Sequence, residues 1–280
     1  MQIEKNPYMS PKPLLPEMEP IKGIKNPIYR LLQVAKSAEG RKKHGVYIIN
    51  GPELVKRALQ YGQCVESVIL SNTFTNTVEG QKLRILAQSQ PVYEVSPGWL
   101  GKAIGSKPLP KCLAIAKRKL STLEELLSTK ELLLMVDDME NIDNLGMLLR
   151  STDATGVGGV LLTGKTPDPF HQRTVRGSRG AVFSIPICMK SNSLKVLHEA
   201  RKKGFQIVAT SANEGFAYTE LDYQRPTIVI VGNEHTGISQ DVLVEAHQVA
   251  NIPMAGQINS LNVSVAASVM LYEAVRQRSV

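Results

Sequence analysis

The sequence is poor in cysteine and in long apolar runs. Its three cysteines, Cys64, Cys112 and Cys188, lack the spacing of a disulfide framework or a metal site, which indicates a reducing compartment. No apolar run approaches the roughly 20 residues of a membrane helix, and prolines interrupt the first 20 residues where a signal peptide would need an apolar core. We therefore expect a cytoplasmic protein with no membrane segment.

The glycine motifs of common nucleotide sites are also missing. The chain contains neither G-x-G-x-x-G nor G-x-x-x-x-G-K-[ST], so dinucleotide-binding and P-loop functions are weakly supported. The five histidines are scattered and are not spaced as metal ligands. We expect no metal ion.

Acidic charge is scarce in the first part of the chain. Residues 1–120 hold 19 Lys and Arg against 8 Asp and Glu, whereas the remaining 160 residues hold 14 against 17. This imbalance favours a polyanionic partner for the first part, and the alternative is a merely solvated basic face. The densest basic cluster, which would contact the phosphates of a nucleic acid, consists of Arg41, Lys42 and Lys43.

The pattern of apolar segments predicts two α/β domains. We expect a flexible tail at 1–20, a first α/β domain at 21–120 that starts with one amphipathic helix over 27–44, a linker at 121–130, and a second domain at 131–280. In the second domain, strands at 131–138, 159–164, 183–189, 205–212, 226–232 and 247–254 alternate with helices. This alternation predicts a largely parallel sheet covered on both faces.

Loops rich in small and polar residues follow three of these strands, at 137–146, 231–237 and 251–262. Ligands of parallel sheets bind beyond the carboxyl ends of the strands. Gly232 and Gly237 would let the backbone approach a ligand closely. Each loop alone could be an ordinary turn, but three together predict a binding site. Its hydrogen-bonding candidates are Asn144, Asn233, Glu234, Asn259 and Asn262.

Three motifs then give a specific resemblance. The first is N-x-G-x-x-x-R, and it comprises Asn144, Gly146 and Arg150. The second is G-x-E-x-x-G, at Gly232, Glu234 and Gly237. The third is I-P-M followed by S-L-N-V-S, from Ile252 to Ser264. In this order they resemble the SpoU–TrmH branch of the SPOUT methyltransferases, which methylate the ribose 2′-hydroxyl of RNA. The resemblance covers 130–280 and extends more loosely into the first domain, at 21–120. It implies that the first domain binds RNA, so the phosphates that Arg41, Lys42 and Lys43 are expected to contact are those of RNA.

This resemblance implies a trefoil knot in the second domain, S-adenosylmethionine as cofactor, and a homodimer. It assigns catalysis to Arg150 and Asn144. Residue 259 or 260 is expected to cap the last helix. The cofactor-binding residues that it implies are Thr210, Gly232, Asn233, Glu234, Gly237, Ile252, Pro253, Met254, Ser260, Leu261 and Asn262.

The role of Arg150 follows from its chemistry. A guanidinium stays protonated near neutral pH, so we expect it to hold a phosphate and stabilise developing alkoxide charge rather than act as a base. It completes the site of its own protomer or of the partner protomer. The segment with Arg176 and Arg179 resembles the thiopeptide-resistance members of the family and is predicted to face RNA phosphates.

The expected substrate is 23S-type ribosomal RNA, because the small tRNA enzymes of the family usually lack a full basic domain. A tRNA substrate and a non-catalytic RNA-binding or assembly role are the alternatives. The target nucleotide, and the choice between housekeeping modification and antibiotic resistance, stay open at this point.

Overall fold

The computed structural model describes residues 17–21, 23–61, 65–129 and 131–279, and the chain forms two compact units. The first unit holds the described residues up to Lys36 together with Ile48–Lys117. The second unit holds Ser37–Tyr47 and the described residues from Arg118 onwards. Most of the predicted flexible tail, and Cys64, lie outside the described residues.

The first unit is built on a five-stranded sheet in the order β1-β4-β3-β5-β2. β4 is parallel to both β1 and β3, and β5 is antiparallel to β3. The strands are β1 (Glu19–Pro20), β2 (Val46–Asn50), β3 (Val65–Ser71), β4 (Val92–Val95) and β5 (Cys112–Lys117). The helices are α1 (Pro27–Val34), α3 (Pro52–Gln60), α4 (Asn72–Thr75), α5 (Val78–Leu86) and α6 (Pro97–Ile104).

The prediction of one continuous helix over 27–44 is wrong. α1 ends at Val34, and a separate helix, α2 (Ala38–His44), follows it. The side chain of Ser37 accepts a hydrogen bond from the Gly40 amide at 3.0 Å and thereby caps α2. α2 ends at Gly45, whose φ of 65° is the left-handed conformation that glycine adopts without strain. This break allows α2 to belong to the second unit.

The second unit contains a seven-stranded sheet whose strands all run parallel, in the order β10-β12-β9-β11-β6-β7-β8. The prediction of a parallel sheet is confirmed. Its strands are β6 (Leu132–Asp137), β7 (Gly159–Thr163), β8 (Ile187–Lys190), β9 (Gln206–Ser211), β10 (Phe216–Ala217), β11 (Thr227–Val231) and β12 (Gln248–Asn251). The central strands β6, β7 and β11 are buried along their whole length, as strands covered on both faces are.

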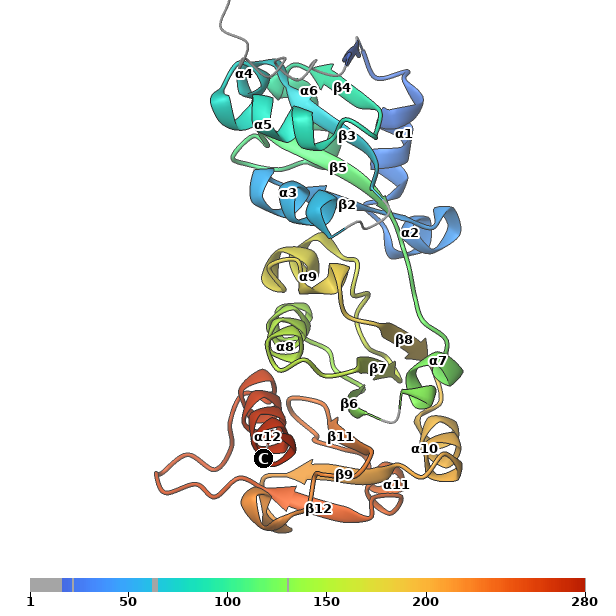
Figure 1. Ribbon diagram of the computed structural model, residues 1–280, viewed down its shortest axis with the longest axis vertical. Helices are drawn as coiled ribbons and strands as arrows, with labels where there is room; N and C mark the ends of the chain where they lie inside the picture. Colours follow the sequence, from blue (N-terminus) through green and yellow to red (C-terminus); the bar gives the residue numbers. More distant parts are fainter. Residues whose placement is uncertain (1–16, 22, 62–64, 130, 280) are drawn as a thin grey trace, which may run out of the picture. The chain divides into compact units, whose positions relative to one another are not determined.

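Helices cover both faces of this sheet (Figure 1). α7 (Leu123–Ser128), α10 (Ser193–Lys202) and α11 (Gln240–Leu243) pack on one face and enclose an apolar core with side chains of β6, β9 and β11. α8 (Ile142–Ala154), α9 (Gln172–Gly177) and α12 (Val263–Arg278) lie on the other side. Short 3₁₀ turns occur at Ala181–Phe183 and Tyr218–Glu220. The trefoil knot stays a prediction.

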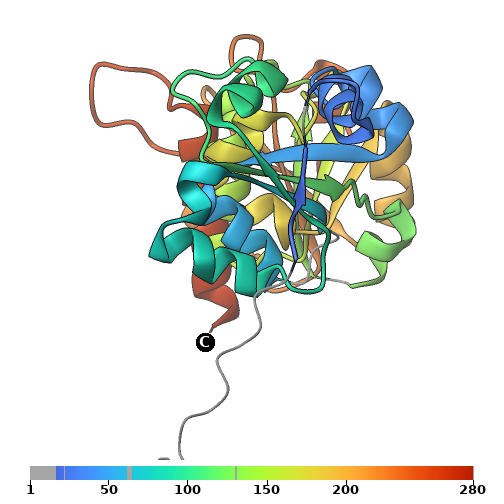
Figure 2. The same ribbon diagram turned by 90° about the horizontal axis from the view of Figure 1, so that it is seen from above.

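Two helix boundaries differ from the sequence analysis and affect the site. α8 begins at Ile142, because the Asn141 side chain caps it, so Asn144 and Gly146 lie in a helix and not in a loop. α12 begins at Val263 with Asn262 as its cap, so capping by residue 259 or 260 is wrong. The segment between β12 and α12 extends away from the rest of the unit (Figures 1 and 2).

Candidate functional site

A cavity of about 970 Å³ lies beyond the carboxyl ends of β9, β11 and β12. Its volume is within the range of small-molecule sites. Four segments far apart in the sequence line it: the start of α8, the loops after β9 and β11, and the chain from β12 into α12. The lining residues are Glu140, Asn141, Asn144, 210–214, 232–238, Leu243, Ala250, Ile252, Met254, 259–263 and Ala266.

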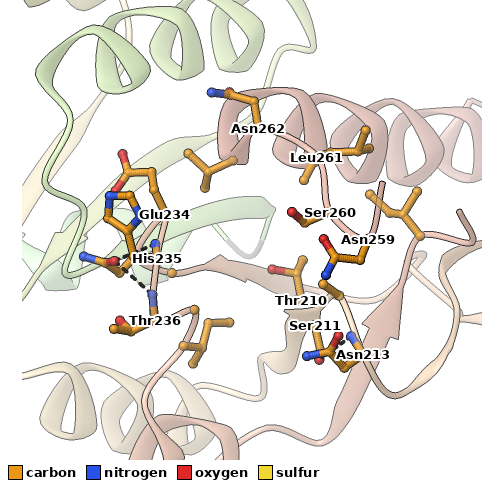
Figure 3. A pocket seen from close by; sticks show the side chains of 18 of the residues that line it. Thr210, Ser211, Asn213, Glu234, His235, Thr236, Asn259, Ser260, Leu261 and Asn262 are labelled. Atoms are coloured by element: carbon orange, nitrogen blue, oxygen red, sulfur yellow. Dashed lines mark hydrogen bonds between the residues drawn. The ribbon is translucent and has the colours of Figure 1, made fainter. Parts of the chain in front are cut away.

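The labelled side chains approach this cavity from two sides (Figure 3). Glu234, His235 and Thr236 lie on one side. Thr210, Asn213, Asn259 and Ser260 lie on the other. The cavity is therefore bounded by carboxamides, hydroxyls and carboxylates that can hydrogen-bond a polar ligand.

Glu234 joins the loop after β11 to the start of α8. Its carboxylate accepts hydrogen bonds from the backbone amides of Glu140 and Asn141, each at 3.2 Å, and from Nδ2 of Asn144 at 2.9 Å. Burial raises the pKa of this carboxyl, but the hydrogen bonds outweigh that effect and hold the pKa below its usual value. Glu234 is therefore ionised at neutral pH and fixes the two segments together.

Asn144 extends the same network to α12. Its side chain is only 5% exposed, and its Oδ1 accepts a hydrogen bond from Nδ2 of Asn262 at 3.0 Å. Oδ1 of Asn262 in turn accepts from the amide of Ser264 at 2.9 Å. The three family motifs thus meet through Glu234, Asn144 and Asn262. This network fixes the side chain of Asn144 at the edge of the cavity, and its catalytic role stays a prediction.

The glycines of the loop after β11 have a structural cause. A Cβ on Gly232 would come within 2.4 Å of the backbone of Gly237, and Gly237 itself has a φ of 72°. Asn233 tightens the turn, because its Oδ1 accepts from the amides of His235 and Thr236. The spacing G-x-E-x-x-G therefore builds the tight loop that presents Glu234.

The arginines of the first motif and of the following segment lie elsewhere. Gly146 of α8 packs against Gly177 of α9, where an added Cβ would be 3.1 Å from the Gly177 Cα. This close approach puts α9 directly beside α8. Arg150, Arg176 and Arg179 are all exposed, and none of them lines the cavity. Within the described residues, no carboxylate pairs with any of the three.

A family comparison gives this arrangement its name. The model of the SpoU rRNA methylase family matches residues 131–272, which contain all three motifs. The chain belongs to the SpoU rRNA methylase family.

Some relatives of this SpoU chain match it along nearly its whole length. It is 32% identical to an uncharacterised tRNA/rRNA methyltransferase of Synechocystis sp. over 95% of this chain and 97% of the relative. The crystal structure of an AdoMet-bound rRNA methyltransferase from Sinorhizobium meliloti is 29% identical with a TM-score of 0.81, over 92% of this chain and 98% of that one. An RNA 2′-O ribose methyltransferase is 31% identical with a TM-score of 0.74, over 93% and 100%.

The structure brings together nearly every cofactor residue that the SpoU resemblance implies. All of them line the cavity except Pro253, which precedes the lining residue Met254. The loop after β9 was not predicted to belong to the site, but its residues Ser211, Asn213 and Glu214 also line the cavity. Its signal was available, because this loop follows an apolar strand of the same parallel sheet.

The structure corrects the prediction that Arg41 contacts RNA. Its side chain is buried, and Nε donates to Oδ2 of Asp168 at 2.6 Å. Lys42 and Lys43 are exposed and remain candidates. Among the described residues, no cluster of three or more metal-ligating side chains occurs. No helix in the same part of the chain has the length and apolarity to cross a membrane.

Proposed function

We propose that this SpoU-family protein transfers a methyl group from S-adenosylmethionine to a ribose 2′-hydroxyl of large-subunit ribosomal RNA. The observation that carries the proposal is the hydrogen-bond network of Glu234, Asn144 and Asn262, which ties the three family motifs around one cavity. The AdoMet-bound neighbour and the 2′-O ribose methyltransferase neighbour support it.

The cavity suits a cationic, amphipathic cofactor. Three carboxylates line it, from Glu140, Glu214 and Glu234, whereas no Lys or Arg is among its described lining residues. Apolar contact is offered by Ile252, Leu261 and Ile238. Bound S-adenosylmethionine would supply a methyl group that its sulfonium already activates. The protein then has to align the hydroxyl with that methyl group and exclude water.

Arg150 is the proposed catalytic residue on the RNA side. Its guanidinium stays protonated near neutral pH, so its role is to hold the phosphate next to the target ribose and stabilise negative charge on the 2′-oxygen. Asn144 lies two turns earlier on α8 and is held by Glu234 and Asn262. The network therefore positions the helix that carries Arg150.

A homodimer would bring Arg150 to a cavity. Met147 of α8 and Val265 and Tyr272 of α12 are large apolar side chains that are 45%, 48% and 55% exposed. α8 and α12 are in contact, with the Ser151 and Ser268 hydroxyls 2.7 Å apart. A two-fold interface would cover this shared surface. Arg150 emerges beside it and does not line its own cavity, so we assign it to the site of the partner protomer.

Ribosomal RNA is the proposed substrate class, because a complete α/β unit accompanies the second unit and the first 120 residues carry the excess of basic charge. Arg176 of α9 and Arg179, which follows that helix, are proposed to contact its phosphates. The proposed setting is rRNA processing in the cytoplasm.

Methyl transfer in vitro tests the proposal. The protein is incubated with methyl-labelled S-adenosylmethionine and either 23S-type rRNA or tRNA transcripts, and 2′-O-methyl positions are mapped by resistance to alkaline cleavage. We expect one resistant linkage in the rRNA and none with Arg150→Ala. Label in tRNA alone would move the substrate class to tRNA. Label on a base would contradict ribose methylation.

A further inference from the structure

Lys42 and Lys43 lie on a helix whose place in the chain and place in the fold disagree. In the sequence, α2 stands between helix α1 and strand β2, which the first unit contains. In the fold, Ser37–Tyr47 belongs to the second unit. Contacts with other residues of the second unit must therefore hold α2 in place.

Asp168 is the centre of that anchor. Its Oδ2 accepts from Nε of Arg41 at 2.6 Å, and its Oδ1 lies 3.4 Å from Nη2 of Arg118. The three side chains are 12%, 3% and 11% exposed, respectively. Asp168 is itself fixed, because its Oδ1 accepts from the amide of Phe170 at 3.0 Å. The segment that leads into α9 thus carries a carboxylate that holds α2.

Aromatic contacts complete the anchor. The rings of Tyr47 and Phe170 are 4.9 Å apart, and the Arg118 guanidinium lies 5.1 Å from the Phe170 ring centre. The amide of Arg118 also donates to the Gly45 carbonyl at 2.7 Å. These contacts bury Tyr47.

A buried ion pair is an expensive way to hold a helix. Desolvating the charges offsets much of their attraction, and apolar residues of similar size often stabilise a fold as well. What a buried pair adds is a defined geometry, because a guanidinium and a carboxylate bond in fixed directions. The anchor is therefore suited to placing α2 in one position.

The exposed lysines of α2 differ from the two lysines at the end of α10. Among the described residues, no carboxylate lies within ion-pair distance of Lys42 or Lys43. At the end of α10, by contrast, Lys202 pairs with Glu199 at 2.9 Å and Lys203 with Glu124 at 2.7 Å. Within the part of the chain that the structure describes, Lys42 and Lys43 thus form no ion pair and are available to an external polyanion.

We infer that α2 is an RNA-docking helix of the second unit, with Lys42 and Lys43 as phosphate contacts and Asp168 as the residue that positions them through Arg41. The inference rests on the proposed function, since it takes the RNA substrate from there. It moves the basic cluster of the sequence from the first unit to the unit that holds the cofactor cavity.

Salt-dependent binding tests the lysines. The probe is an in vitro transcript of 23S-type rRNA, and its affinity is measured between 0.05 and 0.2 M salt for the wild type, Lys42→Gln/Lys43→Gln and the matched control Lys202→Gln/Lys203→Gln. Each lost phosphate contact lowers the log–log slope by roughly 0.7–0.9, so the α2 pair should lower it by about 1.6 and the control by nearly nothing. Equal slopes for the two pairs would overturn the inference.

A double-mutant cycle tests Asp168. Asp168→Asn keeps the size of the side chain and removes its charge. If Asp168 acts by positioning the lysines, this change weakens RNA binding roughly tenfold in the wild-type background. In the Lys42→Gln/Lys43→Gln background it should have little further effect. A merely structural role predicts the same loss in both backgrounds, and that additivity would overturn the inference.

Two further readings separate this inference from the proposed function. S-adenosylmethionine affinity should be unchanged in all of these variants, and a general loss of it with Asp168→Asn would mean that the second unit is disturbed as a whole. Absence of methyl transfer by the wild type would contradict the proposed function. The binding cycle decides the role of α2 independently, because it measures RNA affinity alone.

Discussion

The cofactor cavity and the arginine-bearing surface of α8 and α9 differ in how their polar groups are satisfied. Around the cavity, Asn144 bonds both Glu234 and Asn262, and these bonds hold three segments of the chain together. On the neighbouring surface, Arg150, Arg176 and Arg179 are exposed and have no carboxylate partner among the described residues. The cavity is pre-organised from within, whereas the surface requires a partner to neutralise it.

This difference assigns a different ligand to each region. A site built by internal hydrogen bonds loses little entropy when it binds a small cofactor. Exposed guanidinium groups that have no carboxylate partner among the described residues instead gain most from a phosphate backbone. Changes in one region should therefore leave the ligand of the other unaffected.

The largest expected effect is from Arg150→Ala. Removing a group that stabilises developing charge typically costs about 10²–10³ in rate. S-adenosylmethionine affinity should stay within about twofold, because Arg150 does not line the cavity. Single-turnover methyl transfer and calorimetry measure the two effects. Arg173→Ala is the matched control, since Arg173 is a nearby exposed arginine that already pairs with Asp143. Loss of cofactor binding in a folded Arg150→Ala protein would show that the arginine-bearing surface and the cofactor cavity are not independent.

Asn144→Asp should break the cavity network in a pH-dependent manner. At neutral pH the introduced carboxyl would face Glu234, which is ionised there because hydrogen bonds hold its pKa low. Two adjacent carboxylates cannot both ionise cheaply, so the pKa of the pair rises. Cofactor affinity should then fall by about 10–100-fold at pH 7 and recover as the pH falls towards 5, where the pair holds a proton.

The wild type and Asn144→Ala serve as controls for this experiment. In the wild type, the stabilisation from Glu234 is complete above the ordinary glutamate pKa and is lost only as the pH falls through its lower folded value. Cofactor affinity should therefore be nearly flat from pH 5 to 8. Asn144→Ala should bind the cofactor weakly at every pH in that range. If the cofactor affinity of Asn144→Asp did not change with pH, the interaction of residue 144 with Glu234 would be contradicted.

Mixed dimers test where Arg150 acts. Arg150→Ala and Ser260→Trp, whose indole would fill the cavity, should each be inactive alone. If Arg150 serves the partner's cavity, unfolding and refolding them together should restore up to about a quarter of wild-type activity, from the one intact site of each mixed dimer. No recovery, with mixed dimers present by mass spectrometry, would place Arg150 in the site of its own protomer.

Arg179→Gly should give the smallest effects: it should stabilise the fold and weaken RNA binding. Arg179 has a φ of 54°, which is strained for any residue with a Cβ. Glycine should raise the free energy of unfolding by about 0.5–1 kcal/mol and lower the salt slope of RNA binding by roughly 0.7–0.9. Denaturant titration and RNA binding measure both. Higher stability with unchanged RNA binding would show that the side chain does not meet a phosphate.

The sequence predicts the parallel sheet and most of the cavity for a clear physical reason. Strands such as Leu132–Asp137 and Thr227–Val231 are continuously apolar, and the carboxyl ends of parallel strands meet at one edge. The motifs that follow them therefore converge. The loop after β9 escaped notice because its residues Ser211–Glu214 have no motif and resemble an ordinary turn.

Which residues of the basic cluster are buried and which are exposed could not be predicted in this way. Arg41, Lys42 and Lys43 are consecutive basic residues, and only the partner of the first, Asp168, distinguishes them. That partner is 127 residues away in the chain. The predicted starts of α8 and α12 were wrong for a related reason. Asn141 and Asn262 cap these helices, and each lies in a segment with several asparagines that could equally act as caps.

The separation of the two regions is tested most directly by calorimetric titration of S-adenosylmethionine into the wild type and into the triple variant Arg150→Ala/Arg176→Ala/Arg179→Ala. The predicted result is one cofactor bound per chain in both proteins, with dissociation constants within about twofold of each other, and no binding of NAD to either. Absence of S-adenosylmethionine binding to the wild type, with and without 23S-type rRNA, would contradict the assignment of the cavity. A tenfold or larger loss in the folded triple variant would contradict the separation of cofactor cavity and RNA surface.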